Sequence, residues 1–207
     1  MTFLLVFILG FSIAAVGIIA PGMLNMTIAK ISIDENKNEA LKFALGSVII
    51  VFFQSFIGVF FAKLLEQNPM VSTTLKRFGV VIFLLLTVFF IFKGINQKKQ
   101  KIDVKLEKKK NRFWYGVALS SLNMFAIPYY AFVSLTLATS DLFAFQLPQE
   151  LVFSMAAALG TYTIFYLYAV LFKKVEHKVA FLINNINFFI AAVTGLVAIS
   201  SLYKMFV

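Results

Sequence analysis

The residues of this sequence best suited to bind a small solute are helix breakers and amides set into apolar runs. Pro21 and Gly22 interrupt the first apolar run, and Asn25 follows them. A proline inside a helix removes one backbone hydrogen bond, and an adjacent glycine leaves room for another group to approach the backbone. Within a bilayer, backbone groups freed in this way must be satisfied by protein or by water in a cavity. The stretch therefore predicts a binding site, with a packing kink as the alternative.

A second disturbed stretch lies in the second half of the sequence. Pro128 frees the carbonyl of Met124, and Asn123 places an amide about one turn before the proline. Gln54 adds a further amide on a small polar stripe of another apolar run. The tyrosines of the stretch 150–172 form either a polar face or a packed seam. The predicted substrate-binding residues are Pro21, Gly22, Asn25, Gln54, Asn123, Pro128 and Tyr129.

The residue types needed for catalysis or metal binding are scarce. The sequence has no cysteine, which excludes thiol redox chemistry, disulfides and cysteine metal ligands. Its single histidine, His177, lies in a basic loop, and every Asp and Glu lies in a predicted loop or at the end of an apolar stretch. An intramembrane enzyme would need a buried acid pair, a metal cluster or an activated nucleophile. We therefore expect no enzymatic activity, no catalytic or metal-binding residues and no cofactor.

The composition is that of a membrane protein. Of the 207 residues, 61% are hydrophobic, 26 are Phe and only 14% are charged, and the mean hydropathy is +0.91. About 20 mainly apolar residues are needed to cross a bilayer. Apolar stretches of this length lie near residues 3–29, 40–64, 71–93, 113–138, 150–172 and 180–203. The sequence therefore predicts an all-α integral membrane protein with six transmembrane helices in a single transmembrane domain over residues 1–207.

The positive charges are distributed as in a protein of the bacterial inner membrane. The formal net charge is +10, and positive residues that flank membrane spans stay in the cytoplasm. If both termini lie outside, every Lys and Arg falls on an inner flank except Lys63, Lys76, Arg77 and Lys204. We therefore expect a multi-pass protein whose N-terminus and C-terminus are on the outer side. Because topology accounts for the charges, no nucleic-acid partner is expected.

A basic linker over residues 93–112 separates two halves, 1–92 and 113–207, each with three predicted spans. Its lysines either hold the topology, which we favour, or bind anionic lipid, since each basic residue near a charged leaflet gains about 1 kcal/mol. Three crossings reverse the orientation of the second half, which is the layout of an inverted repeat of two three-helix units. Small residues along the first span permit a homodimer without requiring one.

Short motifs in both halves resemble those of a known family. Pro21–Gly22 lies late in the first span, Gly46 and Gly58 lie in the second, and the segment from Phe113 to Asn123 follows the basic linker. In layout and motifs the whole chain resembles the LysE/RhtB-type amino-acid exporters. The resemblance implies a transporter that exports amino acids or similar small zwitterionic metabolites, and we expect it to act by alternating access. The alternative from another class is a non-transporting membrane scaffold or a subunit of a larger membrane complex.

Two departures from the family's pattern concern the binding of substrate. Met23 stands where the family has a second proline, and Met124–Phe125 stands where a proline and a lysine would follow Asn123. The intramembrane cation of the family is therefore missing. We expect donors such as Asn123 and the backbone amides after Gly22 to hold a carboxylate instead, because a broken helix presents the positive end of its dipole. Such a site suits a neutral or zwitterionic solute.

Overall fold

The computed structural model describes residues 3–19, 22–68, 111–123 and 125–171, together with residues 84, 87, 88, 91, 92, 95, 192, 195 and 199. Pro21, most of the predicted spans 71–93 and 180–203, and nearly all of the basic linker 93–112 lie outside the described residues. The described residues thus cover the predicted spans 3–29, 40–64, 113–138 and 150–172 almost completely.

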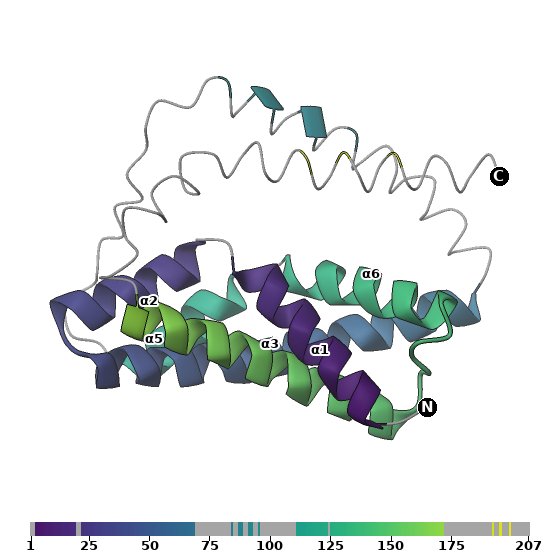
Figure 1. Ribbon diagram of the computed structural model, residues 1–207, viewed down its shortest axis with the longest axis horizontal. Coiled ribbons are helices and arrows are strands. Elements are labelled where there is room, and N and C mark those ends of the chain that lie inside the picture. The colour runs from purple at the N-terminus through teal and green to yellow at the C-terminus, as the bar shows by residue number, and fades with distance from the viewer. Residues whose placement is uncertain are drawn as a thin grey trace. The chain divides into compact units, whose positions relative to one another are not determined.

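All regular structure in the described segments is helical (Figure 1). The labelled helices are α1 (Phe3–Ile18), α2 (Met23–Asp34), α3 (Lys37–Gln67), α5 (Arg112–Ser121) and α6 (Ala126–Thr139). A further helix, Leu147–Leu171, follows α6 in the chain. Because α3 is the first long helix of the chain, we call Leu147–Leu171 the second long helix. The prediction of an all-α protein is confirmed for the residues that the structure describes.

Four of the predicted spans correspond to these helices. By length and composition, α3 and the second long helix can each cross a membrane unbroken. The pairs α1 with α2, and α5 with α6, pass the same test only together, because they are bent by 77° and 64° at short breaks. The described residues therefore hold two spanning helices, or up to four spans if each bent pair counts as one. The six-span inverted repeat of the whole chain stays a prediction.

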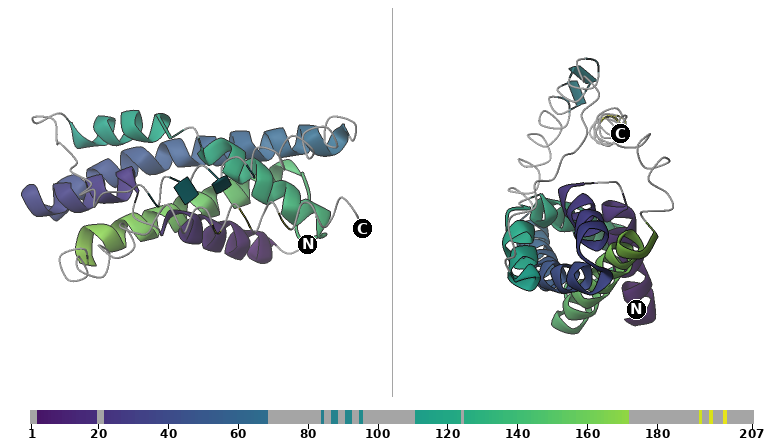
Figure 2. Two further views of the ribbon diagram at one scale, coloured as in Figure 1. Left: turned by 90° about the horizontal axis from the view of Figure 1, so that it is seen from above. Right: turned by 90° about the vertical axis from the view of Figure 1, so that its left-hand side faces the viewer.

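The chain divides into two compact units. The first unit comprises residues 1–64 and 102–176, and it holds nearly all of the helices named above. The second unit comprises residues 65–101 and 177–207, and within it Gly195 lies against Thr87. In the end-on view of Figure 2 the helices of the first unit gather in one bundle. Residues from both halves of the sequence therefore build one core.

Glycines let the helices of the first unit approach closely. The helices α3 and α5 cross at Gly46 and Gly116, and the second long helix crosses α1 at Gly160 and Gly10. At each of these four positions an added Cβ would collide with a backbone carbonyl oxygen of the other helix. Small residues of this kind allow helix backbones to pack in direct contact in lipid. Each long helix thus packs closely against the first segment of a broken helix.

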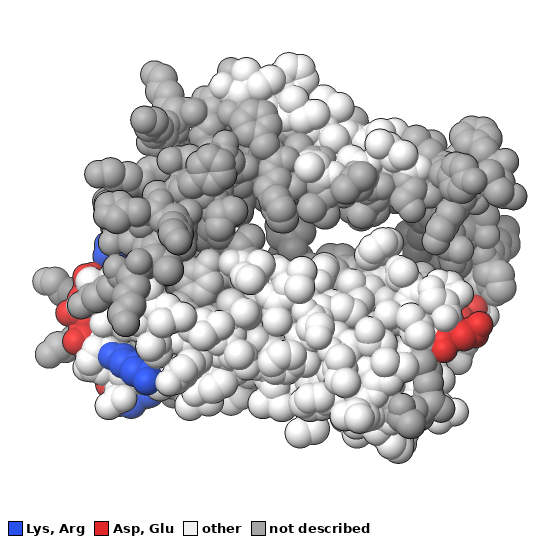
Figure 3. Space-filling model, viewed as in Figure 1, with Lys and Arg blue, Asp and Glu red and all other residues white. Residues whose placement is uncertain are grey.

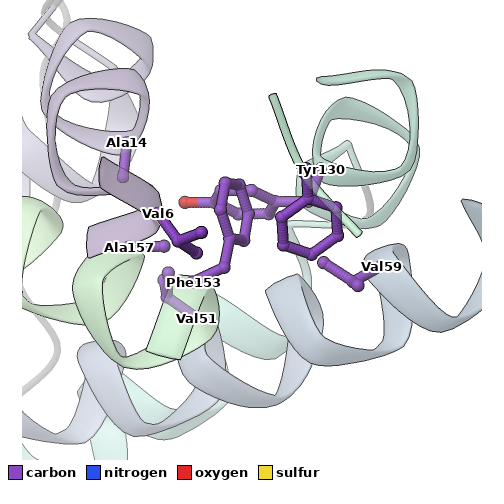
Figure 4. Packing of buried hydrophobic residues seen from close by; sticks show 8 residues of the cluster. Val6, Ala14, Val51, Val59, Tyr130, Phe153 and Ala157 are labelled. Carbon is purple, nitrogen blue, oxygen red and sulfur yellow. The ribbon is translucent and has the colours of Figure 1, made fainter. Parts of the chain in front are cut away.

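Two clusters of buried apolar residues fill the bundle. In the first, the rings of Tyr130 and Phe143 lie 6.4 and 5.5 Å from that of Phe153, centroid to centroid, and Val6 of α1 packs into the same cluster (Figure 4). The second cluster joins α2, α3 and the second long helix through Leu24, Ile28, Ile31, Ala40, Phe43, Ala44, Phe165 and Ala169. Because lipid tails are as apolar as these side chains, the clusters stabilise the bundle mainly by van der Waals packing.

Charged residues mark the two ends of α3. Glu35, just before α3 begins, pairs with Arg112, and Lys63, near the end of α3, pairs with Glu150 at 2.8 Å. On the face shown in Figure 3, the charged residues of the described part gather at two ends, with an uncharged surface between them. A bundle that crosses a bilayer is expected to have this distribution, because a charge at the centre of a membrane costs about 3 kcal/mol on insertion scales.

Candidate functional site

The first break lies between α1 and α2, at residues 19–22. Gly22 is the N-cap of α2 and has an extended backbone, with φ −110° and ψ −178°. The next turn is enclosed by the bundle, since Leu24 and Asn25 are buried. The sequence predicts a breach at Pro21–Gly22, and the helix is interrupted at this position, although Pro21 itself lies outside the described residues.

Two side chains cover the carbonyl end of α1 at the first break. The side-chain amide of Asn25 donates to the carbonyl of Ile18, and the Tyr168 hydroxyl donates to the carbonyl of Ile19 at 2.9 Å. Side-chain hydrogen bonds between membrane helices average about 0.6 kcal/mol, so these bonds stabilise the break modestly.

Tyr168 is not among the predicted site residues, whereas Asn25 is. Tyr168 comes from the second long helix, far along the chain from the carbonyl that it contacts. Its only signal in the sequence is the row of tyrosines in the stretch 150–172, which is equally consistent with a packed seam. Sequence reasoning therefore missed its role at the first break.

Tyr129 of α6 also reaches the first break. Its hydroxyl donates to the carbonyl of Ile13 in α1 at 2.9 Å, about one turn before α1 ends. The hydroxyl lies beside Gly17, where an added Cβ would come within 2.7 Å of it. The predicted site residue Tyr129 therefore contacts the broken helix of the first half of the sequence, although it lies in the second half.

The second break lies between α5 and α6, at residues 122–125. The Gln54 side-chain amide, from the middle of α3, donates to the carbonyls of Ser120 and Asn123 at 3.1 Å each. Gln54 is only 6% exposed, and close by the Ser120 hydroxyl donates to the carbonyl of Ser47. The structure thus brings the predicted residues Gln54 and Asn123 together, with Asn123 contributing its backbone carbonyl rather than its side-chain amide.

Pro128 lies after the second break rather than in it. The sequence predicts a helix disturbed at Pro128, but α6 begins at Ala126, so Pro128 falls in its first turn. Backbone N–H groups in the first turn of a helix have no partner within the helix, so a proline there removes no helical bond. The helix is instead interrupted from Leu122 to Phe125, around Asn123.

The two long helices serve the two breaks in a matched way. In α3, Gly46 at the helix crossing is followed by Gln54, which bonds the carbonyl end of the second break. In the second long helix, Gly160 at the helix crossing is followed by Tyr168, which bonds the carbonyl end of the first break. The intervals 46–54 and 160–168 have the same length. Each long helix therefore stabilises the break that belongs to the other half of the sequence.

The two breaks have the same electrical polarity. Their carbonyl ends accept hydrogen bonds from Asn25, Tyr168 and Gln54. Their amide ends have no side-chain cap, because the N-cap residue of α2 is Gly22 and the N-cap residue Phe125 of α6 makes no side-chain capping bond. The uncapped N-terminus of a helix carries a partial positive charge and favours an anion. The described residues of the two breaks include no charged side chain, so backbone amides supply this charge.

Within the described part of the chain, no three His, Asp or Glu side chains are grouped as metal ligands. The chemistry that the breaks offer is instead hydrogen bonding. The uncapped amide end of α2 can donate, whereas in α6 the Ala126 N–H already donates to the carbonyl of Asn123 and Pro128 has no N–H. Gln54 Oε1 is a buried acceptor atom with no hydrogen-bond partner among the described residues. The arrangement can hold a polar solute.

These features define a class, that of helical membrane proteins in which irregular backbone is enclosed between spanning helices. A family model for the LysE type translocator matches residues 15–205 of the chain. The chain therefore belongs to the LysE type translocator family, and the resemblance seen in its motifs is confirmed. Membership implies a membrane protein that transports solutes. No curated protein and no solved structure matched the chain.

Proposed function

We propose that this protein exports amino acids, or similar small zwitterionic metabolites, by alternating access. The observation that carries the proposal is the shared polarity of the two breaks, with carbonyl ends bonded by side chains and amide ends left without a side-chain cap. Such amide ends attract carboxylates. Membership of a translocator family supports transport as the activity.

The solute's two charged groups have different partners in this proposal. Its carboxylate binds at the amide ends of α2 and α6, and its ammonium group donates to Gln54 Oε1, which is buried and has no partner in the described part of the chain. A site without a charged side chain favours a zwitterion, since binding then buries no net charge. The proposed substrate-binding residues are Pro21, Gly22, Asn25, Gln54, Asn123, Pro128 and Tyr129.

Alternating access follows from two halves that form an inverted repeat. The equal intervals from Gly46 to Gln54 and from Gly160 to Tyr168 support such a repeat, since each pair serves the break of the opposite half. Reversed repeats have two equivalent arrangements, one open to each side of the membrane. A rocking of one half against the other then exposes the breaks to the two sides in turn.

The proposed setting is the bacterial inner membrane, with both termini on the outer side. The concentration of Lys and Arg on the inner flanks supports this orientation. The basic linker 93–112 would then lie against the inner leaflet, where it either holds the topology or binds anionic lipid. The proposed partners are the lipid bilayer, the small-molecule substrate and a second copy of the chain.

Efflux from whole cells tests the proposal. Cells with and without the protein are loaded with a panel of labelled amino acids, and initial efflux rates are measured with and without a proton uncoupler. We expect faster efflux of at least one amino acid, and no effect on the matching amine that lacks the carboxylate. Sensitivity to the uncoupler reports whether protons drive export.

Matched variants connect the efflux to the breaks. Gln54→Leu should lower the efflux rate about tenfold, the change expected when bonds worth about 1.4 kcal/mol are lost. Asn123→Leu keeps the backbone bonds of Asn123 and should lower the rate through loss of the side-chain amide that is proposed to contact the solute. Gln67→Leu and Asn38→Leu make the same chemical changes at exposed positions and should leave the rate unchanged. The proposal is wrong if no compound in a broad panel is exported and if Gly22→Leu and Asn123→Leu change nothing. A Gly22→Leu variant that alters only stability or partner recovery would favour a scaffold.

A further inference from the structure

Two ion pairs lie at opposite ends of α3 and join the first half of the sequence to the start of α5 and to the second long helix. Glu35, just before α3, pairs with Arg112, the first residue of α5. Lys63, near the end of α3, pairs with Glu150 in the first turn of the second long helix at 2.8 Å. At about 1.5 Å per helical residue the pairs are separated by about 40 Å along α3, which is close to the thickness of a bilayer with its headgroups.

Each of these pairs is partly withdrawn from solvent. The side chains of Arg112 and Glu150 are each 4% exposed, whereas their partners Glu35 and Lys63 are 26% and 29% exposed. Loss of one partner from a pair withdrawn from solvent has a much larger effect than the loss of a surface pair. The state of each pair is therefore coupled strongly to the packing around it.

A third ion pair provides a contrast. Glu39 and Lys42 pair at 2.7 Å, but both lie on α3 and the Lys42 side chain is 58% exposed. Movement of one half against the other leaves this pair intact, because both partners move together. Glu39 lies near the same end of α3 as Glu35, so the two carboxylates differ chiefly in whether their partner lies on a different helix.

We propose that the Glu35–Arg112 and Lys63–Glu150 pairs are the two gates of the transporter, one for each side of the membrane. The inference rests on the proposed transport function and adds the contacts that control it. Each carboxylate lies near the start of a long helix and binds a base on a different helix, Arg112 at the start of α5 or Lys63 near the end of α3. A movement that widens one end of the bundle must separate the pair at that end, so alternating access breaks the two pairs in turn.

The absence of cysteine from the sequence allows a direct test. Asn123→Cys places one thiol at the second break, and the hydrogen bonds recorded for Asn123 are made by its backbone, so they are retained. A membrane-impermeant maleimide is applied to whole cells and to inside-out vesicles, and the labelling rate is measured from each side. Glu35→Gln, Glu150→Gln and the control Glu39→Gln are each added to the Asn123→Cys protein.

The two gate variants should shift labelling in opposite directions. Glu35→Gln should raise the rate about tenfold from the side of the Arg112 end, the cytoplasmic side in the proposed orientation, and lower it from the other side. Glu150→Gln should do the reverse, and Glu39→Gln should match the parent. The inference is overturned if both variants change labelling in the same sense, or if neither differs from the Glu39→Gln control.

A charge swap guards against variants that fail to fold. The Glu35→Arg, Arg112→Glu double variant can reform the pair and should restore the labelling pattern of the parent, whereas a swap that behaves like Glu35→Gln alone contradicts the gate.

Labelling requires no substrate, so it separates the gates from the proposed function. Opposite labelling shifts without efflux of any compound would support the gates and refute the proposed substrate, and efflux without labelling shifts would refute the gates alone.

Discussion

Replacement of Tyr168 by Phe removes a single hydroxyl from the first break. That hydroxyl donates to the carbonyl of Ile19 at 2.9 Å, while the ring itself is kept in the variant. Tyr166→Phe is the matched control, because the Tyr166 hydroxyl accepts a bond from Lys37 at an exposed position of the same helix. The two variants make the same chemical change and differ in whether the lost hydroxyl serves the break.

The expected size of the effect follows from the bonds that are lost. Between membrane helices, single side-chain hydrogen bonds average about 0.6 kcal/mol and reach about 1.7 kcal/mol. We therefore expect Tyr168→Phe to destabilise the first break by about 1 kcal/mol, which corresponds to about a fivefold change in an equilibrium.

Two measurements check this expectation. Thermal unfolding of the purified protein in detergent should show a lower melting temperature for Tyr168→Phe than for Tyr166→Phe. Initial efflux rates should change about fivefold for Tyr168→Phe and less than about twofold for Tyr166→Phe. If the two variants behave alike in both assays, the Tyr168 bond does not stabilise the first break and the matched roles of the long helices are refuted.

Two further predictions concern packing and orientation. Gly116→Ala should destabilise the protein by about 1–3 kcal/mol, measured by thermal unfolding, because the added Cβ would collide with the carbonyl of Phe43. The control Gly195→Ala should have little effect, because its Cβ would meet Thr87 at an ordinary 3.4 Å. Equal effects of the two variants would contradict the argument from helix crossing. A reporter enzyme that is active only outside the cytoplasm should be active when fused to either terminus, and activity at one terminus alone would contradict the even number of spans.

The helices were predictable because apolar length alone predicts a span. The predicted stretch 40–64 corresponds to α3, Lys37–Gln67, and the stretch 150–172 corresponds to the second long helix. The interruption near Gly22 was predictable as well, since proline and glycine act locally through the backbone. Element ends were less predictable, because polar residues such as Asp34 continue α2 beyond the apolar run.

The contacts around the breaks were predictable only in part. Gln54 and Asn123 can be selected because amides are rare in apolar runs, but their pairing depends on the crossing of α3 and α5 at Gly46 and Gly116. Tyr168 reaches Ile19 across most of the chain, and no local pattern predicts such a contact. The gate residues were missed for the same reason, since a carboxylate at a helix start has an adequate local role as a partner of the helix dipole.

The position of the second break shows how a local rule can mislead. Pro128 suggested a helix broken at the proline, but a proline in the first turn of a new helix removes no bond. The interruption precedes it, around Asn123, where Gln54 supplies donors to the freed carbonyls. Only the three-dimensional structure reveals that the donor for this break lies in the other half of the chain.

Transport by purified protein tests the central claim most directly. The protein is reconstituted into liposomes loaded with the amino acid selected from the efflux panel, its carboxamide or its decarboxylated amine, and release of each labelled compound is measured. Recognition of a carboxylate by the uncapped amides of α2 and α6 predicts release of the amino acid, with both analogues released no faster than from protein-free liposomes. Equal release of all three compounds, or release of none, would contradict the account.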